Sequence, residues 1–422
     1  MHHFAYKKGV LHAEDVSLAL IAAKVGTPFY CYSTATLARH LDVFRKAFGQ
    51  MDTAVHFAVK ANSNLAVLRT LANLGAGFDV VSGGELQLAL KAGAKAADCV
   101  FSGVGKTKEE LRYAVDVGVG QINIESESEM LSLSAVAAAA GKTVRVALRV
   151  NPDVDAGTHE KITTGKKENK FGIEWTLAPG LYRKAKSLPG LKPTAIAVHI
   201  GSQITDLAPF ENAFLRVREM TLALRAEGIE IDHLDLGGGL GVPYDFSAAA
   251  PPLPAAYGQM VGRVFGNMGC KLSFEPGRVI VGNAGVLVAA VTVLKTGTAK
   301  KFAVLDAGMN DLVRPAMYDA RHDIIPVREP AQGALQTKYD VVGPVCESSD
   351  KFATDAPLPA LAEGDLVAFL TAGAYGATMS GTYNTRPLVP EVLVDGASWA
   401  VVRRRPTFDE MLALEQLPAW LK

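Results

Sequence analysis

An alternation of apolar, strand-like runs with amphipathic, helix-like runs constrains the fold of this chain more than any other feature. It begins near Val55 and continues to about residue 280, with helix signals such as the capping box of Thr107 and Glu110. The strand candidates are Val55–Lys60, Phe78–Ser82, Cys99–Gly103, Gln121–Glu125, Val144–Asn151, Ala195–Gly201, Ile231–Gly237 and Lys271–Pro276. Eight strands separated by helices over roughly 220 residues predict a (β/α)8 barrel. A doubly wound open sheet is the alternative, but it usually has fewer strands and a nucleotide signature on its first turn.

The pattern changes after Val281, where short β-like runs alternate with turns rich in Gly, Pro and Asp. We therefore predict an α/β protein with a TIM-type barrel over residues 28–282, followed by a mainly β domain over 283–422. Residues 1–27 show little pattern beyond a short helix, Asp15–Val25, and are expected to pack on the second domain.

Composition excludes several partners. The 422 residues include 43 basic and 43 acidic side chains, so net charge offers no footprint for nucleic acid or an anionic membrane surface. No apolar stretch approaches the roughly 20 residues that span a bilayer, and no apolar segment follows the N-terminus as in a secretory signal. The cysteines are Cys31, Cys99, Cys270 and Cys346. None belongs to a CxxC pair or a metal-ligand spacing, which favours a cytoplasmic protein without a metal.

Lys60 is the first candidate for chemistry, because the active sites of such barrels lie at the C-terminal ends of the strands. It closes a strand candidate in the run Phe57-Ala58-Val59-Lys60-Ala61-Asn62, among small and apolar residues. Burial there disfavours the ammonium form and can produce the nucleophilic amine of a Schiff-base lysine. The alternative is an ordinary strand-end lysine in water. Asp79, in the second strand candidate, is either a buried helix cap or a partner that orients a cation.

Two later strand ends carry features suited to an anion. The run Gly237-Gly238-Gly239-Leu240-Gly241 offers backbone N–H groups without side-chain obstruction, although it can equally be a permissive turn. The loop Glu275-Pro276-Gly277-Arg278 places an acid beside a fork-shaped cation, which suits a phosphate or carboxylate, or forms an internal ion pair. His199, at the sixth strand, is either a site residue or a satisfied core histidine.

Three loops of the second domain join reactive and charged side chains. They are Gly343–Asp350, which contains Cys346 and Glu347, Asn310–Tyr318, which contains Arg314, and Ala372–Gly376, which contains Tyr375. Such residues between short strands make a poor core and are better explained as the lining of a site, with a solvated surface as the alternative. The segment Asn151–Gly172, rich in Lys and Gly in its middle, is expected to form a mobile loop near the site.

Together these motifs resemble the pyridoxal-phosphate decarboxylases of the alanine-racemase-like barrel fold, and among them the branch that acts on diaminopimelate. The motifs that carry the resemblance are Phe57–Asn62, His199-Ile200-Gly201-Ser202-Gln203, Gly237-Gly238-Gly239, Glu275–Arg278 and Cys346-Glu347-Ser348-Ser349-Asp350. The order and spacing of the set are more specific than any single motif. The resemblance implies a homodimer that decarboxylates meso-2,6-diaminopimelate to L-lysine, the last step of lysine biosynthesis.

The resemblance also implies individual roles. Lys60 would bind pyridoxal 5′-phosphate covalently, His199 would stack on its ring, and Glu275 would pair with the ring nitrogen. The full set expected at the cofactor is Lys60, Asp79, His199, Ser202, Gly237, Gly238, Gly239, Glu275, Gly277, Arg278 and Tyr375. The set expected at the substrate is Arg278, Arg314, Tyr318, Glu347 and Tyr375. Cys346 would be the proton donor, presented with Glu347 by the neighbouring subunit.

Alternative functions remain open on the sequence. A related decarboxylase of ornithine, lysine or arginine needs no partner for a distal carboxylate, whereas Arg314 and Glu347 suit a substrate with an amino acid centre at each end. A racemase of this fold would need a catalytic tyrosine in place of Cys346. A non-catalytic, cofactor-binding regulatory protein would lack reacting residues, which are present here. Phe57 and Arg321 depart from the family pattern but do not touch the expected chemistry.

Overall fold

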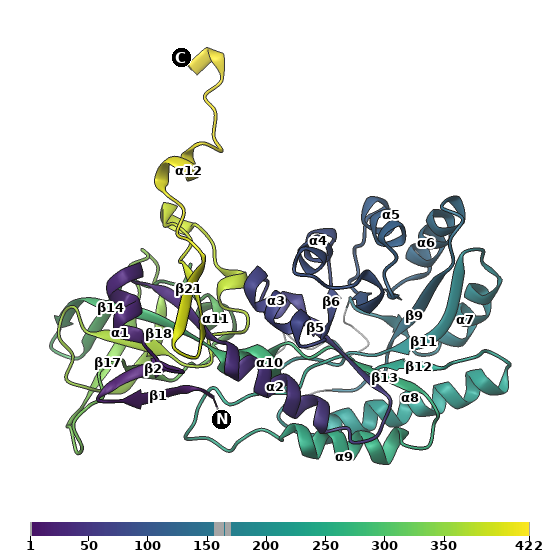
Figure 1. The fold of residues 1–422 in the computed structure, drawn as a ribbon, viewed down its shortest axis with the longest axis horizontal. Coiled ribbons are helices and arrows are strands. Elements are labelled where there is room, and N and C mark those ends of the chain that lie inside the picture. Colours follow the sequence, from purple (N-terminus) through teal and green to yellow (C-terminus); the bar gives the residue numbers. More distant parts are fainter. Residues whose placement is uncertain (1, 156–163, 165–169, 422) are drawn as a thin grey trace. The chain divides into compact units, whose positions relative to one another are not determined.

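The structure, a computed structural model, describes residues 2–155, 164 and 170–421. The chain divides into a barrel unit, Leu37–Pro243 with Ala248–Val281, and a mainly β unit, Met1–Thr36 with Tyr244–Ser247 and Gly282–Lys422 (Figure 1). In the segment expected to form a loop beside the site, residues 156–163 and 165–169 lie outside the described residues. Across the part of the chain that the structure describes, no helix is both long enough and apolar enough to cross a membrane.

The barrel is built from eight parallel strands. They are β5 (Thr53–Ala58), β6 (Gly77–Val80), β7 (Cys99–Phe101), β8 (Gln121–Ile124), β9 (Val144–Asn151), β11 (Leu191–Ala197), β12 (His233–Asp235) and β13 (Lys271–Phe274). Each strand pairs in parallel with the next, and β13 pairs in parallel with β5, which closes the barrel. The short strand β10 (Ile173–Glu174) is added at β9. The predicted (β/α)8 barrel is confirmed, and the open doubly wound sheet is wrong.

Helices follow the strands and surround them (Figure 1). They are α3 (Leu65–Asn73), α4 (Gly83–Lys91), α5 (Lys108–Val117), α6 (Glu127–Ala139), α7 (Ala178–Ser187), α8 (Ala208–Ala226), α9 (Pro254–Phe265) and the short α10 (Arg278–Val281), with α2 (Thr34–Lys46) ahead of β5. Side chains fix several starts. Thr107 and Glu110 form both bonds of the expected capping box at α5. These caps set where each strand-to-helix loop ends, and so help to position the loops at the strand ends.

The mainly β unit contains most of the remaining strands. They are β1 (Phe4–Lys7), β2 (Val10–Ala13), β3 (Val16–Ser17), β4 (Phe29–Ser33), β14 (Gly285–Thr296), β15 (Lys301–Leu305), β16 (Ile324–Pro326), β17 (Gln336–Val342), β18 (Lys351–Pro359), β19 (Leu366–Phe369), β20 (Glu391–Asp395) and β21 (Ser398–Arg403). Its helices are α1 (Leu18–Val25), α11 (Arg314–Tyr318) and α12 (Phe408–Leu412). The largest sheet runs in the order β18-β17-β15-β14-β4-β20-β21.

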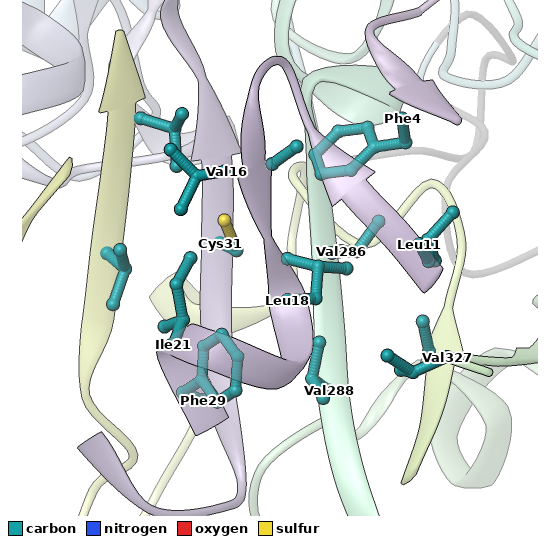
Figure 2. Packing of buried hydrophobic residues seen from close by; sticks show 14 of the residues in the cluster. Phe4, Leu11, Val16, Leu18, Ile21, Phe29, Cys31, Val286, Val288 and Val327 are labelled. Atoms are coloured by element: carbon teal, nitrogen blue, oxygen red, sulfur yellow. The ribbon is translucent and has the colours of Figure 1, made fainter. Parts of the chain in front are cut away.

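The N-terminal segment supplies part of the core of this unit. Phe4, Leu11 and Leu18 are buried against β4 and β14 in one apolar cluster (Figure 2). The residues of β14 in that cluster are Val286 and Val288. Burial of apolar surface therefore ties residues near the N-terminus to strands that begin more than 250 residues later.

The boundaries differ from the sequence-based expectations in two places. We expected the barrel to include residues from 28 onward, but β4 pairs antiparallel with β14 and parallel with β20 in the mainly β unit. A buried strand followed by a helix looks locally like a barrel repeat, while its true partners are distant in sequence. Lys60 also lies outside a strand, because β5 ends at Ala58 and Val59–Ala61 form one short 3₁₀ segment, η1.

Candidate active site

A cavity of about 530 Å³ opens at the C-terminal ends of the barrel strands. This volume lies within the range of small-molecule sites. Its lining comes from loops and ends of many barrel strands: Lys60, Val81, Ser82, Ser102, Gly103, Val104, Gly105, Glu110, Asn123, Arg149, Thr164, Phe171, Ala197, Val198, His199, Asp235 and Glu275. The cavity therefore collects Lys60, His199 and Glu275, three of the residues singled out from the sequence.

Lys60 faces a buried carboxylate. Its Nζ lies 2.9 Å from Oδ2 of Asp79, and the side chain of Asp79 is 0% exposed whereas that of Lys60 is 36% exposed. The helix cap of α4 is Ser82, whose Oγ accepts the N–H of Glu85, so Asp79 is not the cap. Oδ1 of Asp79 is buried and has no hydrogen-bond partner within the described residues. The pair fixes the amine at the wall of the cavity.

Glu85 adds a third charged group near this pair that the sequence analysis did not single out. One of its carboxylate oxygens accepts the N–H of Val81 at 2.8 Å. Burial raises the pKa of Glu85 to about 7; the negative charge of Asp79 adds to this effect, while the Val81 N–H and the Lys60 ammonium oppose it. Near neutral pH this carboxyl group therefore exists in both protonation states.

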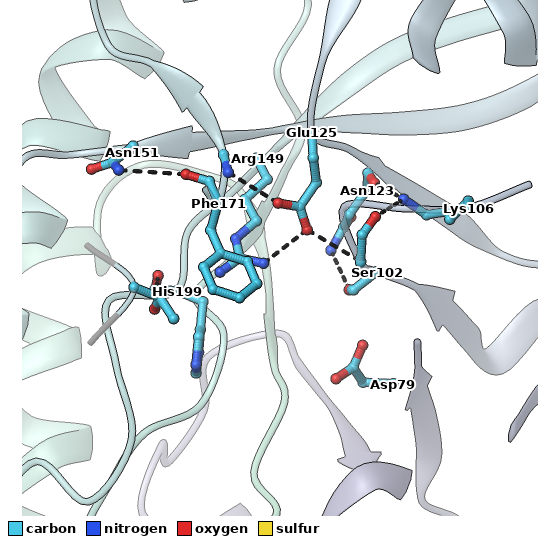
Figure 3. A network of polar contacts seen from close by, with 12 residues as sticks. Asp79, Ser102, Lys106, Asn123, Glu125, Arg149, Asn151, Phe171 and His199 are labelled. Atoms are coloured by element: carbon cyan, nitrogen blue, oxygen red, sulfur yellow. Dashed lines mark hydrogen bonds and ion pairs between the residues drawn. The ribbon is translucent and has the colours of Figure 1, made fainter. Parts of the chain in front are cut away.

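His199 lines the cavity as a neutral imidazole. Its Nδ1 accepts the N–H of Gly238 at 3.2 Å, which leaves the proton on Nε2. Burial, with the positive charges of Arg149 and Lys60, holds the pKa of His199 well below its usual range. The backbone oxygen of His199 also accepts Oγ1 of Thr164 at 2.9 Å. The ring is thus placed at the cavity instead of in an apolar core (Figure 3).

The glycine run packs closely against its neighbouring loops. A Cβ on Gly238 would lie 2.3 Å from the backbone oxygen of Glu275, and one on Gly239 would lie 2.4 Å from that of Gly201. Gly239 also has φ +115°, a conformation that side chains rarely adopt. Only glycine therefore fits this turn without a shift of the backbone around it.

Arg278 and Ser202 stand beside this turn. Nη2 of Arg278 donates to Oγ of Ser202 at 2.9 Å, which links the loop after β13 to the loop after β11. Gly277 permits the approach of a third loop, since its Cβ would lie 2.7 Å from that of Ala61. A hydroxyl, a guanidinium and glycine N–H groups are thereby gathered at one edge of the barrel.

Glu275 belongs to a buried polar network. Its Oε1 accepts Oγ of Ser102 at 3.3 Å and Nδ2 of Asn123 at 3.4 Å. The same amide group of Asn123 donates to Oδ2 of Asp235 at 3.2 Å, so Asp235, at the end of β12, lies close to Glu275. Burial raises the pKa of Asp235 to about 6, and burial together with the charge of Asp235 raises that of Glu275 well above its usual range.

Arg149 and Glu125 form a second buried group at the cavity (Figure 3). Nη1 of Arg149 lies 2.8 Å from Oε1 of Glu125, and the guanidinium carbon lies 5.0 Å from the ring centroid of Phe171. Glu125 also accepts the N–H groups of Gly103 and Gly172 at 3.1 and 3.0 Å. Sequence analysis missed this pair. The rule that site residues lie at the C-terminal ends of barrel strands would have indicated both residues, because Glu125 follows β8 and Arg149 lies near the end of β9.

The remaining predicted residues lie in the mainly β unit. Arg314 begins α11 and is buried, with Nη1 2.7 Å from Nε2 of His322 and its guanidinium 4.2 Å from the ring centroid of Tyr244. Tyr318 ends the same helix. Tyr375 is half-buried and has φ +56°.

The loop that carries Cys346 and Glu347 is organised by Asp350. The two oxygens of the Asp350 carboxylate accept the N–H groups of Val345 and Met309, each at 2.6 Å. Cys346 and Glu347 are exposed in this chain. The Glu347 carboxylate accepts hydrogen bonds from the hydroxyls of Tyr383 and Ser349, which lower the pKa of Glu347. The loop therefore presents a thiol and a fixed carboxylate side by side.

The barrel residues fit pyridoxal 5′-phosphate. The turn at Gly237–Gly239 leaves no room for a Cβ and brings backbone N–H groups, Ser202 and Arg278 together, as a phosphate requires. Lys60 offers an amine, and His199 and Glu275 offer a flat ring and a buried acid in the same cavity.

Comparisons with known proteins extend over both units. A family model described as "Pyridoxal-dependent decarboxylase, pyridoxal binding domain" matches residues 34–282. The diaminopimelate decarboxylase of Zymomonas mobilis is 49% identical over 421 residues, covering 99% of each chain, and that of Vibrio cholerae is 51% identical over 419 residues, again 99% of each. The crystal structure of diaminopimelate decarboxylase from Helicobacter pylori complexed with L-lysine has a TM-score of 0.90 at 38% identity and covers 94% of this chain and 98% of its own.

Proposed function

Because the chain belongs to the diaminopimelate decarboxylase family of pyridoxal-dependent decarboxylases, we propose that it converts meso-2,6-diaminopimelate to L-lysine and carbon dioxide. This is the last step of lysine biosynthesis. The observation that carries the proposal is the Lys60 amine, held 2.9 Å from buried Asp79 in a cavity whose residues fit pyridoxal 5′-phosphate.

The barrel unit holds the cofactor and sets the charges around it. When bound, the cofactor supplies an electron sink for the electron pair left by departing carbon dioxide. Lys60 would form the covalent link to it, and Asp79 would orient the amine. His199, neutral and with its Nδ1 engaged by Gly238, would stack on the ring, and Glu275 would hold a proton at the ring nitrogen.

The phosphate group is bound at the edge of the barrel. The N–H groups of Gly239 and Gly277 would approach it without side-chain obstruction. Gly237 and Gly238, whose N–H groups donate to Asp235 and His199, would instead shape the turn. Ser202 and Arg278 add a hydroxyl and a bidentate cation, and they already contact each other at 2.9 Å. Binding here would hold the ring between Lys60 and Glu275.

The mainly β unit recognises the substrate and returns a proton. Glu347 is an exposed anion with two hydroxyl donors on its oxygens, which suits the distal ammonium of diaminopimelate. Arg314, with Arg278, suits its carboxylates, and Tyr318 and Tyr375 complete the set of substrate residues. The Cys346 thiol donates the proton that replaces the lost carboxyl group.

We further propose that the enzyme is a cytoplasmic homodimer whose sites are shared between subunits. The exposure of Cys346 and Glu347 in the single chain supports this assembly, because residues that act on a substrate need a partner surface to enclose it. In this arrangement the loop of residues 343–350 completes the site of the neighbouring subunit.

The test is a product assay on the purified protein supplied with pyridoxal 5′-phosphate. We expect carbon dioxide and L-lysine from meso-2,6-diaminopimelate, and little release of carbon dioxide from ornithine, lysine or arginine. Preferred turnover of one of those three would instead assign a related decarboxylase. Stereochemical exchange without carbon dioxide would assign a racemase, and cofactor binding without any turnover a regulatory protein.

A further inference from the structure

Two carboxyl groups are buried against each other at the cavity, and we call Asp235 and Glu275 the acid pair. Both are almost fully buried, and Nδ2 of Asn123 donates to both, to Oδ2 of Asp235 at 3.2 Å and to Oε1 of Glu275 at 3.4 Å. Two adjacent carboxylates cannot both ionise cheaply out of water, so the acid pair holds one proton between them.

The surrounding donors decide which of the two acids carries that proton. Oδ2 of Asp235 accepts the side-chain amides of Gln121 and Asn123, each at 3.2 Å. Oδ1 of Asp235 accepts the N–H of Gly237 at 3.1 Å. Within the described residues, Glu275 receives two longer contacts, from Ser102 and Asn123. Hydrogen bonds to an anion favour the charged form, so Asp235 is the anion and Glu275 carries the proton.

The charged groups that face the acid pair are consistent with this assignment. The Asp79 carboxylate raises the pKa of Glu275, as burial and Asp235 do, while the Lys60 ammonium lowers it. Lys60 is itself paired with Asp79. Of the other ionisable groups on the cavity wall, His199 is neutral, Arg149 is paired with Glu125, and Glu110 accepts the N–H groups of Gly83 and Thr107.

We propose that Asp235 is a positioning residue that keeps a proton on Glu275 in the cofactor-free protein, so that Glu275 delivers this proton to the ring nitrogen of incoming pyridoxal 5′-phosphate. The O–H bond of Glu275 breaks and its electron pair stays on the carboxylate, while the ring nitrogen forms an N–H bond with its own lone pair. Nothing is oxidised or reduced. The Asp235 anion then strengthens the hold of the site on that proton. The inference rests on the cofactor of the proposed function, but not on its substrate.

Infrared spectroscopy of the cofactor-free protein tests the first half. At neutral pH we expect the carbonyl band of a protonated carboxylic acid that disappears in Glu275→Gln. It should disappear as well in Asp235→Asn, because Glu275 ionises once its anionic neighbour is removed. The matched control Asp232→Asn, three residues earlier and beside Cys270, should keep the band. If Asp235→Asn does not fold, the comparison of the wild type with Glu275→Gln is sufficient. If their infrared spectra show no difference in the carboxylic acid band, the inference is overturned.

Titration of the cofactor spectrum tests the second half. In Asp235→Asn loaded with pyridoxal 5′-phosphate, the ring nitrogen should lose its proton about one pH unit lower than in the wild type, a roughly tenfold weaker hold. A purely structural role would not move this titration in that direction, and an unchanged titration overturns the inference. Neither readout needs turnover. If the variants show the expected infrared and cofactor spectra but the wild type forms no L-lysine, only the proposed substrate is contradicted. If the wild type forms L-lysine but the spectra of the variants do not change, only the role of Asp235 is contradicted.

Discussion

Lys60 and Asp79 form an ion pair in which the carboxylate is completely buried and the ammonium only partly. The carboxylate is therefore the member that depends on its partner, since its second oxygen has no hydrogen bond within the described residues. Removing one partner of a buried ion pair costs more stability than the intact pair contributes, because the other charge stays buried without a partner. This asymmetry makes Lys60 a structural as well as a chemical element of the site.

We expect Lys60→Ala to abolish both the covalent cofactor absorbance and carbon dioxide release. Urea unfolding should also show a destabilisation of about 1–3 kcal/mol, because Asp79 is left as an uncompensated anion. The double variant Lys60→Ala with Asp79→Asn should recover much of that stability while remaining inactive. A double variant no more stable than Lys60→Ala would show that the buried charge is not the cause.

Cys346→Ala should keep the cofactor spectrum and lower turnover by roughly 10²–10⁴-fold, the usual contribution of a positioned proton donor. Cys270→Ala is the matched control, because this half-buried thiol directly precedes β13 and lies 3.8 Å from the backbone oxygens of both Ile231 and Met268. It should retain near wild-type activity. Full activity of Cys346→Ala would remove the thiol from the reaction.

Gly239→Ala should weaken binding of pyridoxal 5′-phosphate by at least about tenfold, because its Cβ forces the phosphate turn away from Gly201. Gly228→Ala is the control for the strain that alanine suffers at a positive φ, as distinct from the steric contact of the new Cβ. Gly228 also has a positive φ, +77°, but a Cβ there meets nothing within 4 Å. Gly228→Ala should lose about 1–2 kcal/mol of stability, and Gly239→Ala more, because its Cβ also meets backbone. Equal cofactor affinities, measured by fluorescence titration, would argue against the cradle.

Two buried histidines of the barrel, His56 and His233, should contribute a loss of stability as the pH falls below about 6.5. Burial lowers the pKa of His56 to about 4 and that of His233 to about 3, with Arg145 adding to the effect at His233. In the unfolded chain these histidines have the ordinary histidine pKa, so as the pH falls they bind protons there before they do so in the folded protein. Protonation therefore favours the unfolded chain between the ordinary and the lowered pKa values. Burial raises the pKa values of Glu85 and Asp235, and these acids act in the opposite direction, so the test is the difference between variants. From pH 7 to pH 5 the urea midpoint of the wild type should fall relative to that of His233→Gln. An identical slope in that variant would contradict this origin.

Repeating local patterns made the barrel predictable. Each strand candidate was an apolar run followed by an amphipathic helix, so counting them indicated closure at eight. Phe29–Ser33 has the same local appearance, and its place beside β14 depends on a pairing across more than 250 residues. Lys60 was assigned to a strand because alternation does not distinguish the last strand residue from the first residue of a short 3₁₀ segment.

The site was predictable where a motif is contiguous and obscure where single polar residues sit within apolar strands. Gly237–Gly239 and Glu275–Arg278 stand out as short runs. Asn123 and Asp235 alternate with apolar residues in two short strands, and their hydrogen bonds connect strands far apart in the sequence. Composition reveals neither the network nor the proton that it shares.

The seam between β13 and β5 has a consequence for the newly made chain. The pairing of these strands brings the loop of Gly277 against Ala61, next to Lys60, so the cradle and the amine meet only after the last barrel strand has been translated. A ribosome-bound fragment that ends before residue 271 contains Lys60 and the glycine turn but lacks Glu275, Gly277 and Arg278. We therefore expect firm retention of the cofactor only once the last barrel strand and the loop after it have been made.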